Sequence, residues 1–186
     1  MVRRDRRWWC VQGSEHFDSE SCTTACACDL FAAGCWLLAT EDEPRQIASG
    51  LRAYYSAEEM LGQRLVTVCN LKPRKLMGFP SHGMVLCAMD TASGAVEIVN
   101  AHETASVGDR VALELDSLSS ERKEAEAQQT AWPPASANQV KKQKVWETVQ
   151  PQLTTSVCGE ALFAGTRLLA GGLPLVAPTI RGGVIS

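Results

Sequence analysis

The pattern of apolar and polar residues in the middle of the chain predicts a run of short β-strands. Strands are predicted at residues 46–51, 64–69, 83–89, 95–99 and 108–115, each rich in β-branched or apolar side chains and separated from the next by turn residues. In the last of these segments every second residue is apolar, so Val111, Leu113 and Leu115 should face the core. Short strands at this spacing are typical of a small β-barrel.

Helical signals are confined to two places. Ser56 followed by Glu59 is a capping-box pattern and predicts a single helical turn at residues 57–61. Residues 141–149 predict one or two further turns. Beyond them, residues 158–163 are predicted to form a strand, and a glycine-rich tail follows with short strands and turns.

These patterns divide the chain into four regions. Residues 1–40 show no clean period of 2 or 3.6 and form an atypical N-terminal segment, although residues 30–38 could form a short helix or strand. Residues 41–115 form the strand-rich domain. Residues 116–139 are rich in Glu, Ala, Gln, Ser and Pro and are predicted to be a linker or surface excursion, and residues 140–186 form a small β-rich unit. The predicted fold class is therefore all-β.

The net charge of −3 conceals a strong asymmetry along the chain. Residues 45–87 hold six basic and two acidic side chains, and residues 140–186 hold five and two, whereas the segment between them is acidic. A slightly acidic whole does not exclude a polyanionic partner, because phosphates respond to the local field within about 8 Å. Without an apolar run of about 18 residues or a signal-peptide cleavage site, we expect a cytoplasmic protein with no membrane partner.

Few residues are suited to catalysis. The three histidines, His16, His82 and His102, lie in no metal-binding or triad spacing, and the sequence contains neither a phosphate-cradling glycine loop nor a nucleophile elbow. We therefore expect a protein that is not an enzyme and that requires no cofactor.

The N-terminal cysteines, among eight in the chain, suggest a redox or metal enzyme as a weaker alternative function. Cys22, Cys26 and Cys28, with His16 and Cys35, could hold zinc or an iron–sulfur cluster, but they do not form the two separated knuckles typical of zinc sites. No metal site is predicted. The remaining cysteines in apolar surroundings are interpreted as buried, reduced side chains: Cys69, Cys87 and Cys158.

The segment from residue 70 to 78 (Asn-Leu-Lys-Pro-Arg-Lys-Leu-Met-Gly) carries the strongest candidate binding site. It lies between two predicted strands, so it should form a loop whose backbone Pro73 stiffens. Its three cations are Lys72, Arg74 and Lys75. Ser81, His82 and Gly83 follow with hydroxyl and imidazole groups and a place for close backbone approach. Fixed cations with small donors suit phosphate groups, although an ordinary solvated basic hairpin has the same appearance.

Three stretches carry a resemblance to a known family: residues 45–51 (Arg-Gln-Ile-Ala-Ser-Gly-Leu), the segment 70–78, and residues 81–84 (Ser-His-Gly-Met). They resemble the tRNA-binding OB-fold domain that is appended to many methionyl- and some tyrosyl-tRNA synthetases. The run from Lys141 through Trp146 to Leu153 resembles the endothelial monocyte-activating polypeptide type of that domain. The resemblance implies an OB-fold barrel followed by a small β-rich C-terminal appended subdomain that imitates the second subunit of dimeric relatives.

This resemblance implies a non-catalytic module that binds folded tRNA by its backbone and shape and supports aminoacylation. The tRNA-binding residues that it carries over are Asn70, Lys72, Arg74, Lys75, Ser81 and Met84. Of these, Met84 should support the loop from the core rather than touch RNA. The implied partners are tRNA and aminoacyl-tRNA synthetases. The appended subdomain implies a monomer, and a scaffold or interaction domain of a multi-synthetase complex is the alternative function.

The resemblance fails near the N-terminus. The family's first strand, its His-Pro segment and its second strand have only an echo at residues 16–21, and residues 22–39 are unrelated, longer sequence. The expectation is therefore a barrel with altered N-terminal strands, open edges and a reduced core.

Overall fold

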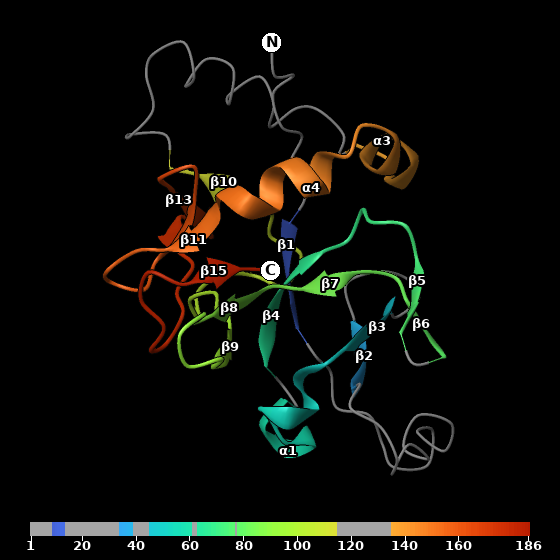
Figure 1. Cartoon of the computed structure of the whole chain (residues 1–186), viewed down its shortest axis with the longest axis horizontal. Coiled ribbons are helices and arrows are strands. Elements are labelled where there is room, and N and C mark those ends of the chain that lie inside the picture. Colours follow the sequence, from blue (N-terminus) through green and yellow to red (C-terminus); the bar gives the residue numbers. More distant parts are fainter. Residues whose placement is uncertain (1–8, 14–33, 39–44, 61–62, 77, 115–134) are drawn as a thin grey trace.

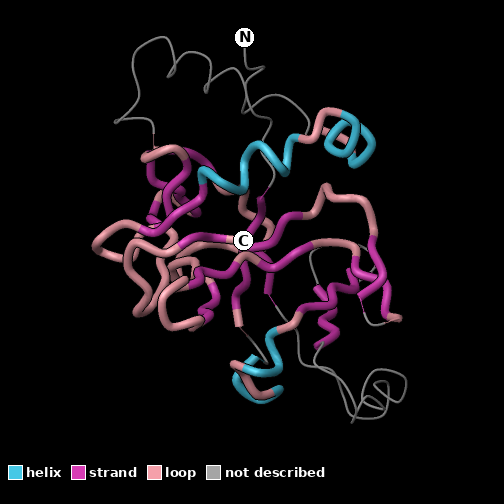
Figure 2. Tube along the Cα trace, in the orientation of Figure 1, coloured by secondary structure: helices cyan, strands magenta, loops and turns pink. Residues whose placement is uncertain are grey.

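The protein is described by a computed structural model, which describes residues 9–13, 34–38, 45–60, 63–76, 78–114 and 135–186. Strands dominate these residues, and the helices are short (Figure 2). The predicted all-β class is confirmed, with a curled, half-closed sheet at its centre.

Two strands are present in the N-terminal region where the family pattern is altered. Strand β1 (Trp9–Gly13) pairs antiparallel with β4 (Arg64–Val68), which also pairs with β7 (Met84–Val85). Strand β2 (Gly34–Leu38) pairs with β3 (Arg45–Ser49) along its whole length. Of the two possibilities left open for residues 30–38, a short helix or a strand, the structure shows a strand. The echo at residues 16–21 lies outside the described residues.

Strand β4 separates two hydrophobic cores. Its alternate residues Val66 and Val68 belong to the larger core, whereas Leu65 packs in a smaller core with Ile47 and Met60. Successive side chains of a strand point to opposite faces, so a strand between two cores must be apolar on both. This geometry explains why residues 64–69 form a nearly continuous apolar run.

The C-terminal strands form one sheet with strands of the predicted barrel. One sheet has the order β10-β13-β12-β11-β15-β8-β9, with β14 beside β13. Its strands are β8 (Cys87–Met89), β9 (Val96–Ile98), β10 (Ala112–Leu113), β11 (Leu153–Thr155), β12 (Ala161–Phe163), β13 (Thr166–Ala170), β14 (Leu173–Pro174) and β15 (Val184–Ile185). Ile185 pairs with Ala88, and Cys87 and Ser186 exchange two backbone hydrogen bonds of 2.9 Å. The predicted barrel and the predicted appendage thus share a sheet and a core, as Figure 1 shows around β8 and β15.

The short helices follow the local signals in part. In the first, α1 (Ala57–Met60), Ser56 N–H donates to Glu59 Oε2 at 2.8 Å and Glu59 N–H donates to Ser56 Oγ at 3.2 Å, so the predicted capping box is confirmed. A 3₁₀ turn (Leu51–Ala53) precedes it. The predicted helix at 141–149 is two helices, α3 (Ala137–Lys142) and α4 (Val145–Val149), and a second 3₁₀ turn (Gln150–Gln152) follows.

Helix α3 also shortens the predicted linker, because it begins within residues 116–139. The part of that linker from residue 116 to 134 lies outside the described residues.

The three cysteines that were predicted to be buried differ in exposure. Cys87 is buried, which raises the pKa of its thiol to about 12, and Cys69 is half-buried. Cys158 is exposed, contrary to prediction, because it lies in the turn that connects β11 to β12 rather than in a strand.

Glu97 on β9 fastens the segment that precedes β15. Its carboxylate accepts hydrogen bonds from the backbone N–H of Thr179 (2.8 Å) and Ile180 (3.0 Å) and from the Thr179 hydroxyl. Desolvation raises the pKa of this carboxyl group. The hydrogen bonds from Thr179 and Ile180 and the charge of Arg181 together outweigh that effect, so the pKa lies below its ordinary value.

We expect Glu97→Gln to lower stability at neutral pH by about 1 kcal/mol, because hydrogen bonds to a charged acceptor become bonds to a neutral one. A lowered pKa means that the ionised carboxylate stabilises the fold above the unfolded-state pKa, and that this stabilisation is lost as the pH falls through the folded-state value. Thermal unfolding of both proteins from pH 7 to pH 3 should therefore show the difference shrinking in acid. A constant difference, or an equal effect of Glu103→Gln at an exposed carboxylate, would contradict this role.

Candidate nucleic-acid interface

The basic segment forms a β-hairpin. Strand β5 (Arg74–Leu76) pairs with β6 (Phe79–Ser81) in the register Arg74 to Ser81, Lys75 to Pro80 and Leu76 to Phe79. Gly78 at the turn has a φ of 90°, which glycine adopts without strain. The predicted loop is therefore an ordered hairpin that projects from the side of the molecule (Figure 1).

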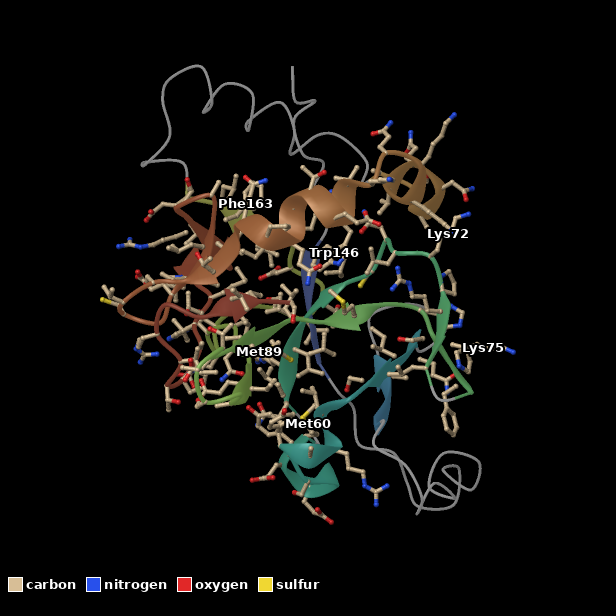
Figure 3. All side chains as sticks on the ribbon, in the orientation of Figure 1. Met60, Lys72, Lys75, Met89, Trp146 and Phe163 are labelled. Carbon is tan, nitrogen blue, oxygen red and sulfur yellow. The ribbon has the colours of Figure 1, made fainter. Side chains whose placement is uncertain are left out.

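The three cations of the hairpin face solvent. Lys72, Arg74 and Lys75 are all exposed, and Figure 3 shows the Lys75 side chain extending away from the ribbon. In the part of the chain that the structure describes, none of the three forms an ion pair with a carboxylate. Their charge is therefore available to an external anion.

The base of the hairpin is held by Ser81, whose side chain is 7% exposed. Its hydroxyl accepts a hydrogen bond from Ala48 N–H at 3.0 Å and can donate to the carbonyl of Gly83 at 2.9 Å or of Ala48 at 3.3 Å. The neighbouring His82 N–H donates to the carbonyl of Gln46 at 2.9 Å. The expected donor to RNA is thus occupied in bracing the hairpin against β3, and a direct contact of Ser81 with RNA stays a prediction.

Asn70 lies at the other end of the segment and is half-buried. Its Nδ2 donates to the carbonyl of Ala135 at 3.0 Å, and its Oδ1 is buried without a hydrogen-bond partner among the described residues. Asn70 therefore connects the end of β4 to the residue that precedes the cap of α3. Met84 pairs with Val68 and packs against the larger core, as expected for a residue that supports the loop from inside.

Gly83 has a different role from the one expected. A Cβ atom at this position would lie 2.6 Å from Ile47 Cδ1 and 3.0 Å from the carbonyl oxygen of Val68. The close approach that requires glycine is therefore to neighbouring strands, not to a ligand. Ser81 and Gly83 together brace the hairpin, and local sequence gave no sign of their partners.

No alternative chemistry appears in the described residues. They contain no group of three or more His, Cys, Asp or Glu side chains that could hold a metal ion. Cys22, Cys26, Cys28 and His16 lie outside these residues. None of the described helices is long and apolar enough to cross a membrane.

A half-closed antiparallel barrel with a hairpin that exposes three cations is the architecture of a class of small β-proteins suited to binding polyanions. Residues 35–110 match the family described as "Putative tRNA binding domain". The predicted family is confirmed, and the matched residues span β2 to the segment before β10, including the whole hairpin.

Curated relatives share this region with the chain. It is 34% identical over 122 residues to the tRNA-aminoacylation cofactor arc1 of Schizosaccharomyces pombe, an alignment that covers 66% of this chain and 23% of arc1. The chain is 33% identical over 143 residues to the cytoplasmic methionine–tRNA ligase of Caenorhabditis elegans (76% and 14%). It is 41% identical over 70 residues to the methionine–tRNA ligase of Methanocaldococcus jannaschii (38% and 11%). The chain thus spans less than a quarter of the length of these relatives.

A solved structure matches almost the entire chain. The C-terminal domain of Plasmodium vivax p43 superposes with a TM-score of 0.74 at 24% identity, covering 97% of both chains. Because the superposition includes the C-terminal strands as well as the barrel, the two regions occur together as one fold in both proteins.

Proposed function

We propose that this protein is a non-catalytic module that binds folded tRNA through the β5–β6 hairpin and supports aminoacylation. The observation that carries the proposal is the set of exposed cations Lys72, Arg74 and Lys75 on a hairpin that Ser81 fixes to β3. The family of residues 35–110 makes tRNA the expected polyanion.

The proposed mechanism is electrostatic capture by a surface that is already ordered. Each cation that neutralises a phosphate releases condensed counterions, which makes binding favourable and dependent on salt. Pro73, the strand pairing and the Ser81 hydrogen bonds fix the hairpin backbone before RNA arrives. Less conformational entropy is then lost on binding. Contacts to phosphates position the RNA without reading its sequence, so recognition rests on the shape of the folded tRNA.

The six predicted site residues divide by role. We assign Lys72, Arg74 and Lys75 to direct phosphate contact, because they are exposed and unpaired among the described residues. Asn70, Ser81 and Met84 are assigned to positioning, because their side chains bond or pack within the protein. The resemblance implies that Asn70 and Ser81 bind tRNA, and hydrogen bonds from the Asn70 amide nitrogen or the Ser81 hydroxyl to RNA would compete with these internal bonds.

The partners beyond tRNA follow from the relatives. Two are named as methionine–tRNA ligases, one of them cytoplasmic, and one as an aminoacylation cofactor, which supports aminoacyl-tRNA synthetases as partners and a cytoplasmic location. We also propose a monomer, because β15 occupies the edge of β8 that a second subunit could otherwise use.

The test is a titration of fluorescently labelled folded tRNA with the full chain at several salt concentrations between 50 and 200 mM. We expect saturable binding in which log K falls with log salt with a slope of about −3 or steeper, as for three or more phosphate contacts. A single-stranded RNA of the same length should bind more weakly. Absence of saturable binding, or binding that is insensitive to salt, would overturn the proposal. Recovery of a synthetase without any tRNA affinity would favour the scaffold alternative.

A further inference from the structure

A second group of cations lies where α3 meets α4. Lys141 and Lys142 occupy the last turn of α3, and Lys144 separates the two helices. All three are exposed. We call these three lysines and the turn between the helices the α3 corner.

The α3 corner is held in place from both sides. Ser136 N–H donates to Gln139 Oε1 at 2.9 Å and Gln139 N–H donates to Ser136 Oγ at 3.4 Å, which caps the start of α3. Val140 and Val149 are each 3% exposed and pack in the larger core. The backbone that carries the lysines is therefore held in place by these contacts, although the helices are short.

Lys144 occupies an unfavourable backbone conformation. Its φ is 49° and its ψ 41°, in the left-handed region where glycine or asparagine is usual. Its carbonyl accepts hydrogen bonds from the Thr148 N–H and hydroxyl at 3.2 and 3.0 Å, which holds the turn. Favourable interaction with the helix dipole accounts for lysines within the last turn of α3. The helix dipole does not account for Lys144, which lies between α3 and α4.

The α3 corner adjoins the hairpin. The Asn70 side chain bonds the carbonyl of Ala135, directly before the α3 cap, while Lys72 begins the cationic segment two residues later. Figure 3 shows Lys72 between α3 and the hairpin that carries Lys75. The two groups of cations thus lie on the same side of the molecule, and Asn70 connects their backbones.

Other basic side chains in the described residues are mostly used inside the protein. Arg64 donates to the carbonyls of Glu103 and Ala105, Arg181 donates to backbone carbonyls, and Arg167 forms ion pairs with Glu114 and Glu160. Among the described basic side chains, those without such a bond are Lys72, Arg74, Lys75, Arg110, Lys141, Lys142 and Lys144. All except Arg110 belong to the hairpin or to the α3 corner.

We propose that the α3 corner is a second phosphate-binding patch, which takes the sugar-phosphate backbone of the same RNA beyond the part that the hairpin holds. This proposal rests on the proposed function and extends its surface into the C-terminal region. Because the Asn70 bond fixes the two patches relative to each other, the surface matches phosphates that are themselves rigidly spaced. A base-paired RNA stem offers such phosphates, whereas a flexible single strand must be ordered to do so.

The test compares variants of the full chain with folded tRNA and with single-stranded RNA. The combined change Lys141→Gln, Lys142→Gln and Lys144→Gln should weaken tRNA binding about tenfold and reduce the salt slope by roughly two to three. The loss for single-stranded RNA should be smaller. Arg110→Gln is the matched control and should leave the slope unchanged, because Arg110 is an exposed cation two residues before β10. Strand β10 lies on the opposite side of Figure 1 from α3 and β5.

Lys144→Gly separates charge from folding. Glycine favours the left-handed conformation at this position, so this variant should fold at least as well as the parent and still bind tRNA more weakly. An unchanged affinity and slope in both corner variants overturns the inference. If the corner variants bind normally while hairpin variants lose affinity, the proposed function stands and only the second patch is lost. If neither set changes binding, both proposals fail.

Discussion

Removal of the three hairpin cations together should weaken tRNA binding on the order of a hundredfold at near-physiological salt and reduce the salt slope by roughly 2.7. The variant is Lys72→Gln, Arg74→Gln and Lys75→Gln. All three side chains are exposed and none contributes to either core, so the fold should be retained. Fluorescence anisotropy with folded tRNA at several salt concentrations measures the change, and circular dichroism verifies folding.

A charge-preserving control sharpens this result. Lys72→Arg with Lys75→Arg keeps the cations at the same positions and should retain most of the affinity, because phosphate binding of this kind depends mainly on charge. Equal losses in both variants would mean that the hairpin acts through shape alone. An unchanged slope in the glutamine variant would remove the hairpin from the binding site.

Leu153→Ala should destabilise the whole chain by about 2–5 kcal/mol, the range for deleting a fully buried leucine side chain. Leu153 is 0% exposed in the larger core, which includes Val66 and Val68 of the barrel strand β4 and Leu168 and Leu175 of the C-terminal region. We therefore expect a single unfolding transition in urea, with a lower midpoint and loss of tRNA binding at that same midpoint.

The matched control is Val157→Ala. Val157 is 88% exposed in the turn after β11, so its truncation should change stability by less than about 0.5 kcal/mol. Two resolved transitions in Leu153→Ala, with tRNA binding retained after the first, would show that residues 41–115 fold independently of the C-terminal region. That outcome would mean that the two domains predicted from the sequence fold separately, and that the chain is not a single cooperative unit.

Local signals in the sequence predicted the features that depend on neighbouring residues. The capping box at Ser56 and Glu59 and the apolar strand at 64–68 need only a few adjacent residues to be specified, and both are present in the structure. The cations at 72–75 likewise stand out as a run. The hairpin conformation was harder to predict from the sequence, because the pairing of β5 with β6 depends on how the flanking strands are placed.

Features that depend on distant partners were not predictable. The Ser81 hydroxyl meets Ala48, and the Asn70 amide meets Ala135, across separations that no sequence pattern records. A polar side chain in a basic loop is equally suited to RNA and to a backbone group, so the sequence alone could not show that the Ser81 hydroxyl bonds within the protein. The α3 corner had a usable signal, since Ser136 and Gln139 have capping-box spacing just before the lysines.

The pairing of β15 with β8 has a consequence for synthesis on the ribosome. Strand β8 is made early, but one of its neighbours is a segment near Val184 that emerges only after the rest of the sheet. Until then the edge of β8 that β15 will cover presents unpaired backbone groups, which can pair with another nascent chain. Truncated products that stop before β15 should therefore aggregate, and conditions that slow elongation should favour aggregation over correct closure of the sheet.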